Sequence, residues 1–194
     1  MTVTCDVTVS EDRRRLVDAV LERRGRIDVL VNNAGIGLYA AFGDVKEADL
    51  RELLEVDLVA VFRMTQEVLP AMRAAGRGAI VNVASTGGLI AHAPNVSAYL
   101  AAKHAVVGMS RGLRRDLEGT GISVQVVCPH LTDTKFFEVG VGAEAMREAA
   151  GRLRNRMDTA EDVAEGTAEQ IGIGSFIIFP TERARAAYER FRDL

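Results

Sequence analysis

The segment Ala79-Ile80-Val81-Asn82-Val83-Ala84-Ser85 is a mostly apolar run that ends in a hydroxyl group. An apolar run of this length is typical of a strand that is buried inside a sheet. Ser85 would then lie at the carboxyl end of that strand, and open α/β sheets bind their ligands at this edge. Ser85 is therefore the first candidate for a residue of a functional site.

Downstream of Ser85, a tyrosine and a lysine lie four positions apart, at Tyr99 and Lys103. Residues 97–117 predict a helix, and residues i and i+4 share one face of a helix. A phenol titrates near ~10, and a neighbouring cation lowers that pKa by roughly 1–3. Lys103 is thus expected to bring the pKa of Tyr99 towards the range of efficient acid–base catalysis. Such a pair is common on ordinary helices, so alone it is weak support for catalysis.

Another polar loop, Asn32-Asn33-Ala34-Gly35, follows a second apolar run at 27–31. Together with Ser85, Tyr99 and Lys103 this loop resembles the short-chain dehydrogenase/reductase family. The resemblance implies that Ser85 orients a substrate carbonyl or hydroxyl and that Tyr99 transfers the proton. It also implies that Lys103 lowers the tyrosine pKa and holds the nicotinamide ribose.

The resemblance extends from Cys5-Asp6-Val7 to about Pro180 and implies NAD or NADP as cofactor, with a small alcohol or carbonyl compound as substrate. The family also uses the segment 136–155 as a lid over the substrate and the first asparagine loop as a brace of the sheet. Besides Tyr99 and Lys103, the residues expected to line the cofactor groove are Asp6, Asn32, Ala34, Gly35, Pro129 and Thr134.

The loop after the apolar run 122–127 departs from the family in part. The family pattern is Pro-Gly-x-Val-x-Thr, in which the backbone and the threonine meet the nicotinamide amide. Pro129 and Thr134 match this pattern, whereas His130 and Thr132 do not. His130 either faces the substrate or is a plain loop residue.

Asp57 lies on the apolar stripe of a helix that is expected to start at the capping box Asp44-x-x-Glu47 and to end near Ala75. An unpaired charge on such a face is costly, so Asp57 needs a partner or water. The family usually has asparagine here, which helps to hold a water that links the active-site lysine to solvent. The resemblance implies a relay role for Asp57, with a changed charge beside Lys103. The alternative is a solvated helix carboxylate.

Strands and helices alternate along the chain, which predicts a doubly wound parallel sheet, a Rossmann-like fold of the α/β class. One domain over residues 1–194 is expected. The expected strands are 3–7, 27–31, 79–84, 122–127 and 175–179.

The glycine-rich turn that the resemblance implies, Gly-x-x-x-Gly-x-Gly after a first strand, is absent from this sequence. The chain is therefore expected to enter the family fold at its third strand, as an N-terminally truncated version without the first two strands. The strand at 3–7 would lie roughly 14 Å from the strand at 27–31, whose edge would be open to pairing. Either the protein continues upstream, or half of the cofactor site has been lost.

Because this turn is absent, two functions from different classes stay open. The first is an NAD(P)-dependent oxidoreductase that interconverts an alcohol and a ketone or aldehyde. The second is a non-catalytic, truncated remnant that acts as an oligomerisation or binding module. The resemblance implies a homodimer or homotetramer formed through the helices that carry Tyr99 and Asp57, although close packing inside one chain explains their small residues almost as well.

The composition, with 48% hydrophobic and 26% charged residues and a net charge of −3, is that of a soluble globular protein. Arg13-Arg14-Arg15 lies on an expected amphipathic helix, which favours a solvated face over a nucleic-acid site. No apolar stretch approaches the ~20 residues of a membrane span. The two cysteines form no motif, which indicates a reducing compartment, so a cytoplasmic enzyme is expected. His92 and His104 have no metal-like partners, and no metal site is predicted.

Overall fold

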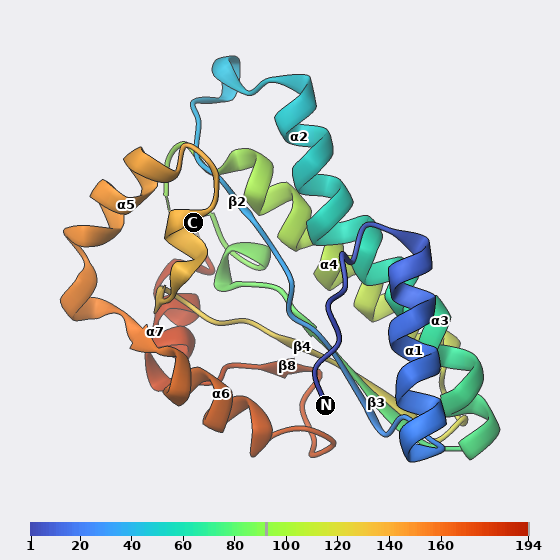
Figure 1. Ribbon diagram of the computed structural model, residues 1–194. Coiled ribbons are helices and arrows are strands. Elements are labelled where there is room, and N and C mark those ends of the chain that lie inside the picture. Colours follow the sequence, from blue (N-terminus) through green and yellow to red (C-terminus); the bar gives the residue numbers. More distant parts are fainter. Residues whose placement is uncertain (92, 194) are drawn as a thin grey trace.

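The computed structural model describes residues 1–91 and 93–193, and four parallel strands form its central sheet (Figure 1). The order of the strands across the sheet is β1-β3-β4-β8. Their bounds are β1 (Val29–Asn32), β3 (Gly78–Val83), β4 (Ile122–Val127) and β8 (Ile177–Ile178). The predicted parallel α/β sheet of Rossmann-like type is confirmed. The prediction about His92 falls outside the described residues.

Helices connect these strands and cover the sheet. Figure 1 shows α1 beside α3 at one end of the molecule, with α5, α6 and α7 gathered at the other. The bounds of the α-helices in the described residues are α1 (Ser10–Arg24), α2 (Glu47–Leu54), α3 (Ala60–Ala75), α4 (Ser97–Asp116), α5 (Ala143–Gly151), α6 (Ala160–Ala168) and α7 (Glu182–Phe191). None of these helices is long and apolar enough to cross a membrane.

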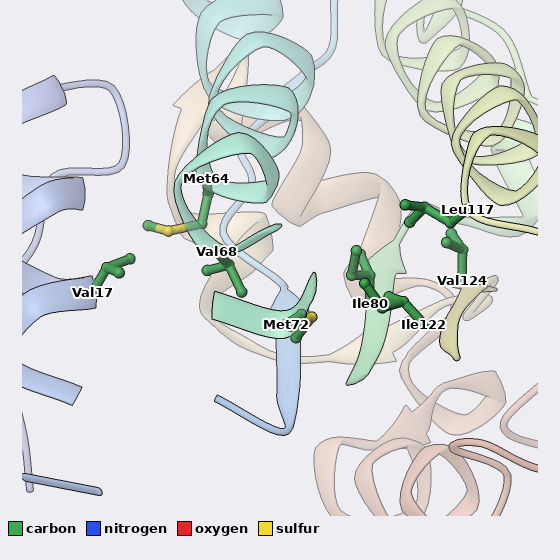
Figure 2. Close-up of a cluster of buried hydrophobic side chains, with 8 residues drawn as sticks. All are labelled: Val17, Met64, Val68, Met72, Ile80, Leu117, Ile122 and Val124. Atoms are coloured by element: carbon green, nitrogen blue, oxygen red, sulfur yellow. The ribbon is translucent and has the colours of Figure 1, made fainter. Parts of the chain in front are cut away.

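A buried cluster joins α1, α3 and the end of α4 to one face of the sheet (Figure 2). Ile80 of β3 and Val124 of β4 point to this face because alternate residues of a strand share a side. Burying each such side chain contributes about 1.5–3 kcal/mol. The cluster consists of Val17, Met64, Val68, Met72, Ile80, Leu117, Ile122 and Val124.

The strand predicted at residues 3–7 is wrong, because this segment is coil that leads into α1. Its backbone carbonyls are instead satisfied by arginines of α1. The Arg13 Nη1 atom donates to the Val7 carbonyl over 2.6 Å, and the Arg15 Nη2 atom donates to the Thr4 carbonyl over 2.9 Å. A strand needs a neighbouring strand, and no strand of the described residues lies between this segment and β1.

Strand β1 forms the edge of the sheet, as its sequence position predicts, but it is not covered on both faces. Val29 is 44% exposed and Val31 is 46% exposed, whereas Asn32 is buried. A continuous apolar run predicts a strand covered on both faces. The exposure of Val29 and Val31 shows that this prediction is wrong for one face of β1.

Two helix starts differ in how they are capped. The helix expected from Asp44 begins only at Glu47, after Lys46, and its start has no side-chain cap, so the predicted capping box is wrong. Asp44 belongs to a short 3₁₀ turn, 42–44, and is not at the helix start. At α6, by contrast, Thr159 and Asp162 form a complete capping box.

Two short parallel pairs of strands lie outside the central sheet, and neither is predicted from the sequence. Strand β2 (Gly37–Leu38) pairs with β6 (Gly140–Val141), and β5 (Thr132–Asp133) pairs with β7 (Asp158–Thr159). The first pair attaches residues 135–151 to the loop that follows β1. Both pairs lie in segments that follow the carboxyl ends of the central strands.

The turn between α4 and β4 provides a direct test of the packing. Gly121 has φ +77°, and a Cβ atom there would collide with the backbone of Gly76. Gly119, in the same turn, has φ +78° and open space around its Cβ position. Both Gly→Ala variants carry the left-handed strain of about 1–2 kcal/mol. Gly121→Ala should lose about 1–3 kcal/mol more than Gly119→Ala because it also overpacks. Urea unfolding measures both values, and equal losses would contradict this packing.

Candidate active site

The end of β3 presents Ser85 in an extended conformation, with φ −173° and ψ 161°. Its Oγ atom accepts a hydrogen bond from the Gly87 amide over 3.0 Å and so caps the 3₁₀ turn Thr86–Gly88. The next glycine packs on α4, where a Cβ at Gly88 would lie 2.8 Å from the Lys103 carbonyl oxygen. The loop therefore holds Ser85 against the helix that carries the tyrosine and the lysine.

Tyr99 and Lys103 lie on the same face of α4, one turn apart. The Lys103 Nζ atom is 5.7 Å from the centre of the Tyr99 ring and 3.3 Å from the Val83 carbonyl oxygen. Ser85 and Tyr99 border the same glycine, because the Cβ position of Gly87 is 3.4 Å from Ser85 Oγ and 3.8 Å from Tyr99 Cε1. The structure thus brings together the three side chains that the sequence singles out.

Asp57 is fully buried and contacts Lys103 directly, with 3.0 Å between Oδ2 and Nζ. Its other oxygen, Oδ1, accepts a hydrogen bond from the Ile36 amide over 2.8 Å. The expectation of a partner is confirmed, and the partner is Lys103. The alternative of a solvated helix carboxylate is wrong, because Asp57 faces the protein interior and not solvent.

A local irregularity of the helix positions this carboxylate. Between α2 and α3 the backbone forms a π-helical turn, Glu55–Val59, with Asp57 at its centre. Such turns are rare inside α-helices and are frequent at functional sites. The helical periodicity of the sequence does not predict this turn. The sequence does show that Asp57 is a carboxylate on an apolar stripe.

Gly35 lies directly against the ion pair. A Cβ at this position would be 3.3 Å from Asp57 Oδ2 and 3.4 Å from Lys103 Nζ. A side chain there would crowd both charged groups. Glycine therefore lets the backbone after β1 pack directly against the Asp57–Lys103 pair.

The pKa of Tyr99 is raised above its ordinary value, and burial is the main cause. The Lys103 charge and the Ser85 hydrogen bond lower this pKa, while Asp57 and Cys128 raise it. The sequence-based prediction is right about Lys103, whose charge lowers the pKa of Tyr99. It is wrong about the overall shift, because the pKa of Tyr99 is raised. Burial of a phenol penalises the charged form, and no sequence pattern reveals its size.

Two further groups complete the electrostatics of the site. Burial works against the charge of Lys103, but Tyr99 and Asp57 together outweigh burial and raise the pKa of Lys103. Burial raises the pKa of the Cys128 thiol to about 12, so this residue is a neutral thiol at physiological pH.

The Asn32 side chain forms hydrogen bonds inside the protein. Its amide nitrogen donates to Asn82 Oδ1 over 2.8 Å and to Thr65 Oγ1 over 3.2 Å. Asn82 in turn donates to Ser110 Oγ over 2.8 Å. This buried chain of hydrogen bonds links β1, α3, β3 and α4, so Asn32 braces the sheet as expected. A direct role in cofactor binding stays a prediction.

The other expected groove residues lie in different places. The Pro129 carbonyl accepts from the Thr86 amide over 2.8 Å, which places the loop after β4 beside Ser85. Thr134 is exposed and accepts from the Phe136 amide over 3.3 Å. Ala34 is exposed in the loop after β1. Asp6 is also exposed, and its carboxylate bonds within its own turn to Thr8, so these bonds do not join it to the cluster around Tyr99.

His130 adopts a defined position in this region. Its Nδ1 atom lies 2.9 Å from Thr86 Oγ1, one residue after Ser85. The pair links the loop after β4 to the loop after β3. His130 thus bridges two loops of the site. The sequence alone does not predict this role.

The segment expected to form a lid packs against the site. The Phe136 ring lies 5.7 Å from the Tyr99 ring, measured between centres, at an angle of 58°. A Cβ at Gly37 would be 2.7 Å from Met146 Cε, so α5 lies close to β2. Sequence reasoning misses these two contacts, although the glycines of the β2–β6 pair mark a close approach of two backbones.

The sequence profile described as short chain dehydrogenase matches residues 1–141. The chain belongs to this family. Within the family it is similar to a putative ketoacyl reductase of Streptomyces coelicolor, with 44% identity over 135 residues that cover 68% of the chain and 51% of the relative. It is also similar to the 3-oxoacyl-acyl-carrier-protein reductase of Thermotoga maritima, with 36% identity over 161 residues, 82% of the chain and 65% of the relative. The chain thus spans about half to two thirds of the length of these relatives.

Solved structures of the family share the fold. A short-chain dehydrogenase/reductase from Burkholderia phymatum in complex with NAD superposes with a TM-score of 0.85 and 27% identity, covering 97% of the chain and 73% of that structure. A gluconate 5-dehydrogenase from Burkholderia cenocepacia, in complex with NADP and tartrate, gives a TM-score of 0.64 and 34% identity over 68% of the chain and 51% of that structure. Membership of the short-chain dehydrogenase family therefore rests on both sequence and fold.

Proposed function

We propose that the protein is an NAD(P)-dependent oxidoreductase that interconverts an alcohol and a ketone or aldehyde. One observation carries this proposal: Ser85, Tyr99 and Lys103 meet at the carboxyl end of β3, with the lysine ammonium 5.7 Å from the tyrosine ring. A phenol beside a hydroxyl and an ammonium can donate a proton to a carbonyl oxygen. Membership of the family supports the same chemistry.

Each residue has a separate task in this proposal. The Ser85 hydroxyl donates a hydrogen bond that orients the substrate carbonyl, and Tyr99 gives its proton to the carbonyl oxygen. The bound nicotinamide cofactor supplies the hydride. Lys103 stabilises the phenolate that remains, and Asp57 holds Lys103 in place through the 3.0 Å ion pair.

The residues near Tyr99 suit the nicotinamide and its ribose. Lys103 carries three donor hydrogens, and the backbone at Gly35 lies close to its ammonium. Tyr99, Lys103, Gly35, Pro129 and Thr134 would line this half of the groove. The pyrophosphate half has no counterpart in the sequence, which contains no Gly-x-x-x-Gly-x-Gly turn, and we assign no residue to it. NAD and NADP are both supported by complexes of related structures.

The substrate is proposed to be a small ketone or the corresponding alcohol. Three relatives are named as putative ketoacyl reductases, and another, from Cupriavidus necator, as a D-beta-hydroxybutyrate dehydrogenase. The segment over the site presents Phe136 beside Tyr99, which favours an apolar body next to the reacting carbonyl. A cytoplasmic location, a single domain and a homodimer or homotetramer remain parts of the proposal.

The alternative, a non-catalytic oligomerisation or binding module, is supported by the missing glycine turn. A binding and turnover experiment separates the two functions. The chain is titrated with NADH and NADPH while their fluorescence is followed, and is then given a β-keto ester. The proposal expects a change in fluorescence and oxidation of the nicotinamide. Absence of both would leave the non-catalytic module.

The dependence of rate on pH follows from the raised pKa of Tyr99. Carbonyl reduction needs the phenol, so its rate should stay level between about pH 6 and pH 9. Alcohol oxidation needs the phenolate, whose fraction increases about tenfold per pH unit below the pKa. The oxidation rate should therefore increase with pH over the whole range. An oxidation rate that levels off near pH 7 would contradict this electrostatic description.

A further inference from the structure

Asp57 and Lys103 form a buried ion pair immediately beside Tyr99. The Asp57 side chain is 0% exposed and the Lys103 side chain is 6% exposed, with 3.0 Å between the charged atoms. The same ammonium is 5.7 Å from the centre of the Tyr99 ring. The Asp57 carboxylate is thus closer to the Lys103 ammonium than the centre of the Tyr99 ring is.

We propose that Asp57 is a positioning residue that offsets part of the charge of Lys103 towards Tyr99, so that the site works as a proton donor to carbonyls near neutral pH and only weakly as a base towards alcohols. This inference rests on the proposed function. It assigns the site a preferred protonation state, beyond the general reaction of the family.

Several titratable groups act on the Tyr99 phenol. Lys103 lies on the same helix, Asp57 on the π-helical turn 55–59 and Cys128 just after β4. Cys128 is a neutral thiol. The remaining two groups carry opposite charges 3.0 Å apart, so Asp57 offsets part of the Lys103 charge that acts on the phenol, and Lys103 keeps the larger effect.

The position of Asp57 is fixed from three sides, which makes a different pairing difficult. The Ile36 amide binds Oδ1, the π-helical turn sets the backbone, and Gly35 packs so closely that its Cβ position is 3.3 Å from Oδ2. Lys103 also donates to the Val83 carbonyl. An asparagine at position 57 would fill the same space and leave Lys103 with an uncompensated positive charge.

The reduction needs one hydride and one proton. A bound reduced nicotinamide would supply the hydride to the carbonyl carbon and would be oxidised. The carbonyl oxygen takes the Tyr99 proton, and water later returns a proton to the phenolate. The reverse reaction starts from the phenolate, which the burial of Tyr99 disfavours. Removing the Asp57 charge would restore the field of Lys103 and populate the phenolate at lower pH.

The test is a spectroscopic titration of Tyr99 in the full chain, without substrate or cofactor. The sequence contains three tyrosines, so Tyr39→Phe with Tyr188→Phe leaves Tyr99 as the only phenol. Phenolate absorbance is followed against pH, with circular dichroism to define the folded range. In this background Asp57→Asn should lower the midpoint by at least about one pH unit. Asp158→Asn is the control because it removes another buried carboxylate, which is paired with Arg183 and Thr181.

A second variant covers the case in which Asp57→Asn does not fold. Asp57→Asn with Lys103→Gln buries no unpaired charge, and its midpoint should rise by no more than about one pH unit above the parent, because Asp57 already offsets part of the Lys103 charge. An unchanged midpoint in Asp57→Asn, or a midpoint more than about one pH unit higher in the double variant, would overturn the inference. Neither result depends on turnover, so failure here is distinct from failure of the proposed oxidoreductase function.

Discussion

Tyr99→Phe should lower the turnover number for carbonyl reduction by roughly 10²–10⁴-fold, which is the usual contribution of a positioned acid. The phenol is the proton donor in the proposed reaction, and phenylalanine keeps the ring that packs against Phe136. Binding of NADH or NADPH, followed by fluorescence, should change little. The measurement is the initial rate with a β-keto ester at saturating cofactor.

The control for this variant is Tyr188→Phe. Tyr188 stacks on Phe179 with 5.1 Å between ring centres, and it lies on α7, outside the proposed site. It removes the same hydroxyl group, so any general effect of losing a phenol should appear there too. Turnover retained in Tyr99→Phe would remove the acid–base assignment.

Lys103→Met should lower the free energy of unfolding by about 3–5 kcal/mol, because it leaves the fully buried Asp57 carboxylate without its partner. The methionine side chain fills a similar space, so lost packing contributes little. The free energies come from urea unfolding followed by circular dichroism. Replacing both partners, with Asp57→Leu and Lys103→Met, should restore most of the stability because no unpaired charge remains.

Lys46→Met is the matched control for the single variant. Lys46 is exposed before α2, where such a change stays within about 0.5 kcal/mol. If Lys103→Met cost no more than Lys46→Met, the buried ion pair would not contribute to the native state as the structure indicates.

Local pattern predicts the central fold well. The run 122–127 becomes β4 with the same bounds, and the segment 97–117 becomes α4 to within one residue. These segments are buried against several neighbours, so their apolar periodicity reflects their environment. The site follows for the same reason, because Ser85 ends a buried strand and Tyr99 lies one turn from Lys103 on one helix.

The failures have physical causes that a single segment does not reveal. Residues 3–7 have the composition of a strand, but a strand forms only beside another strand, and here α1 arginines bind the free carbonyls instead. The partner of Asp57 lies on another helix, and the π-helical turn that aims the carboxylate has no periodic signature. The raised pKa of Tyr99 reflects burial by the whole site, which the spacing of Tyr99 and Lys103 does not encode.

The most direct test of the account is hydride transfer by the chain itself. The protein is incubated with a β-keto ester and NADH or NADPH that carries deuterium at the transferring carbon, and the alcohol product is analysed by mass spectrometry. We expect one deuterium in the product of the unmodified chain and none above background with Tyr99→Phe. A chain that gives no labelled alcohol with either cofactor would contradict the proposal that Ser85, Tyr99 and Lys103 form a working reductase site.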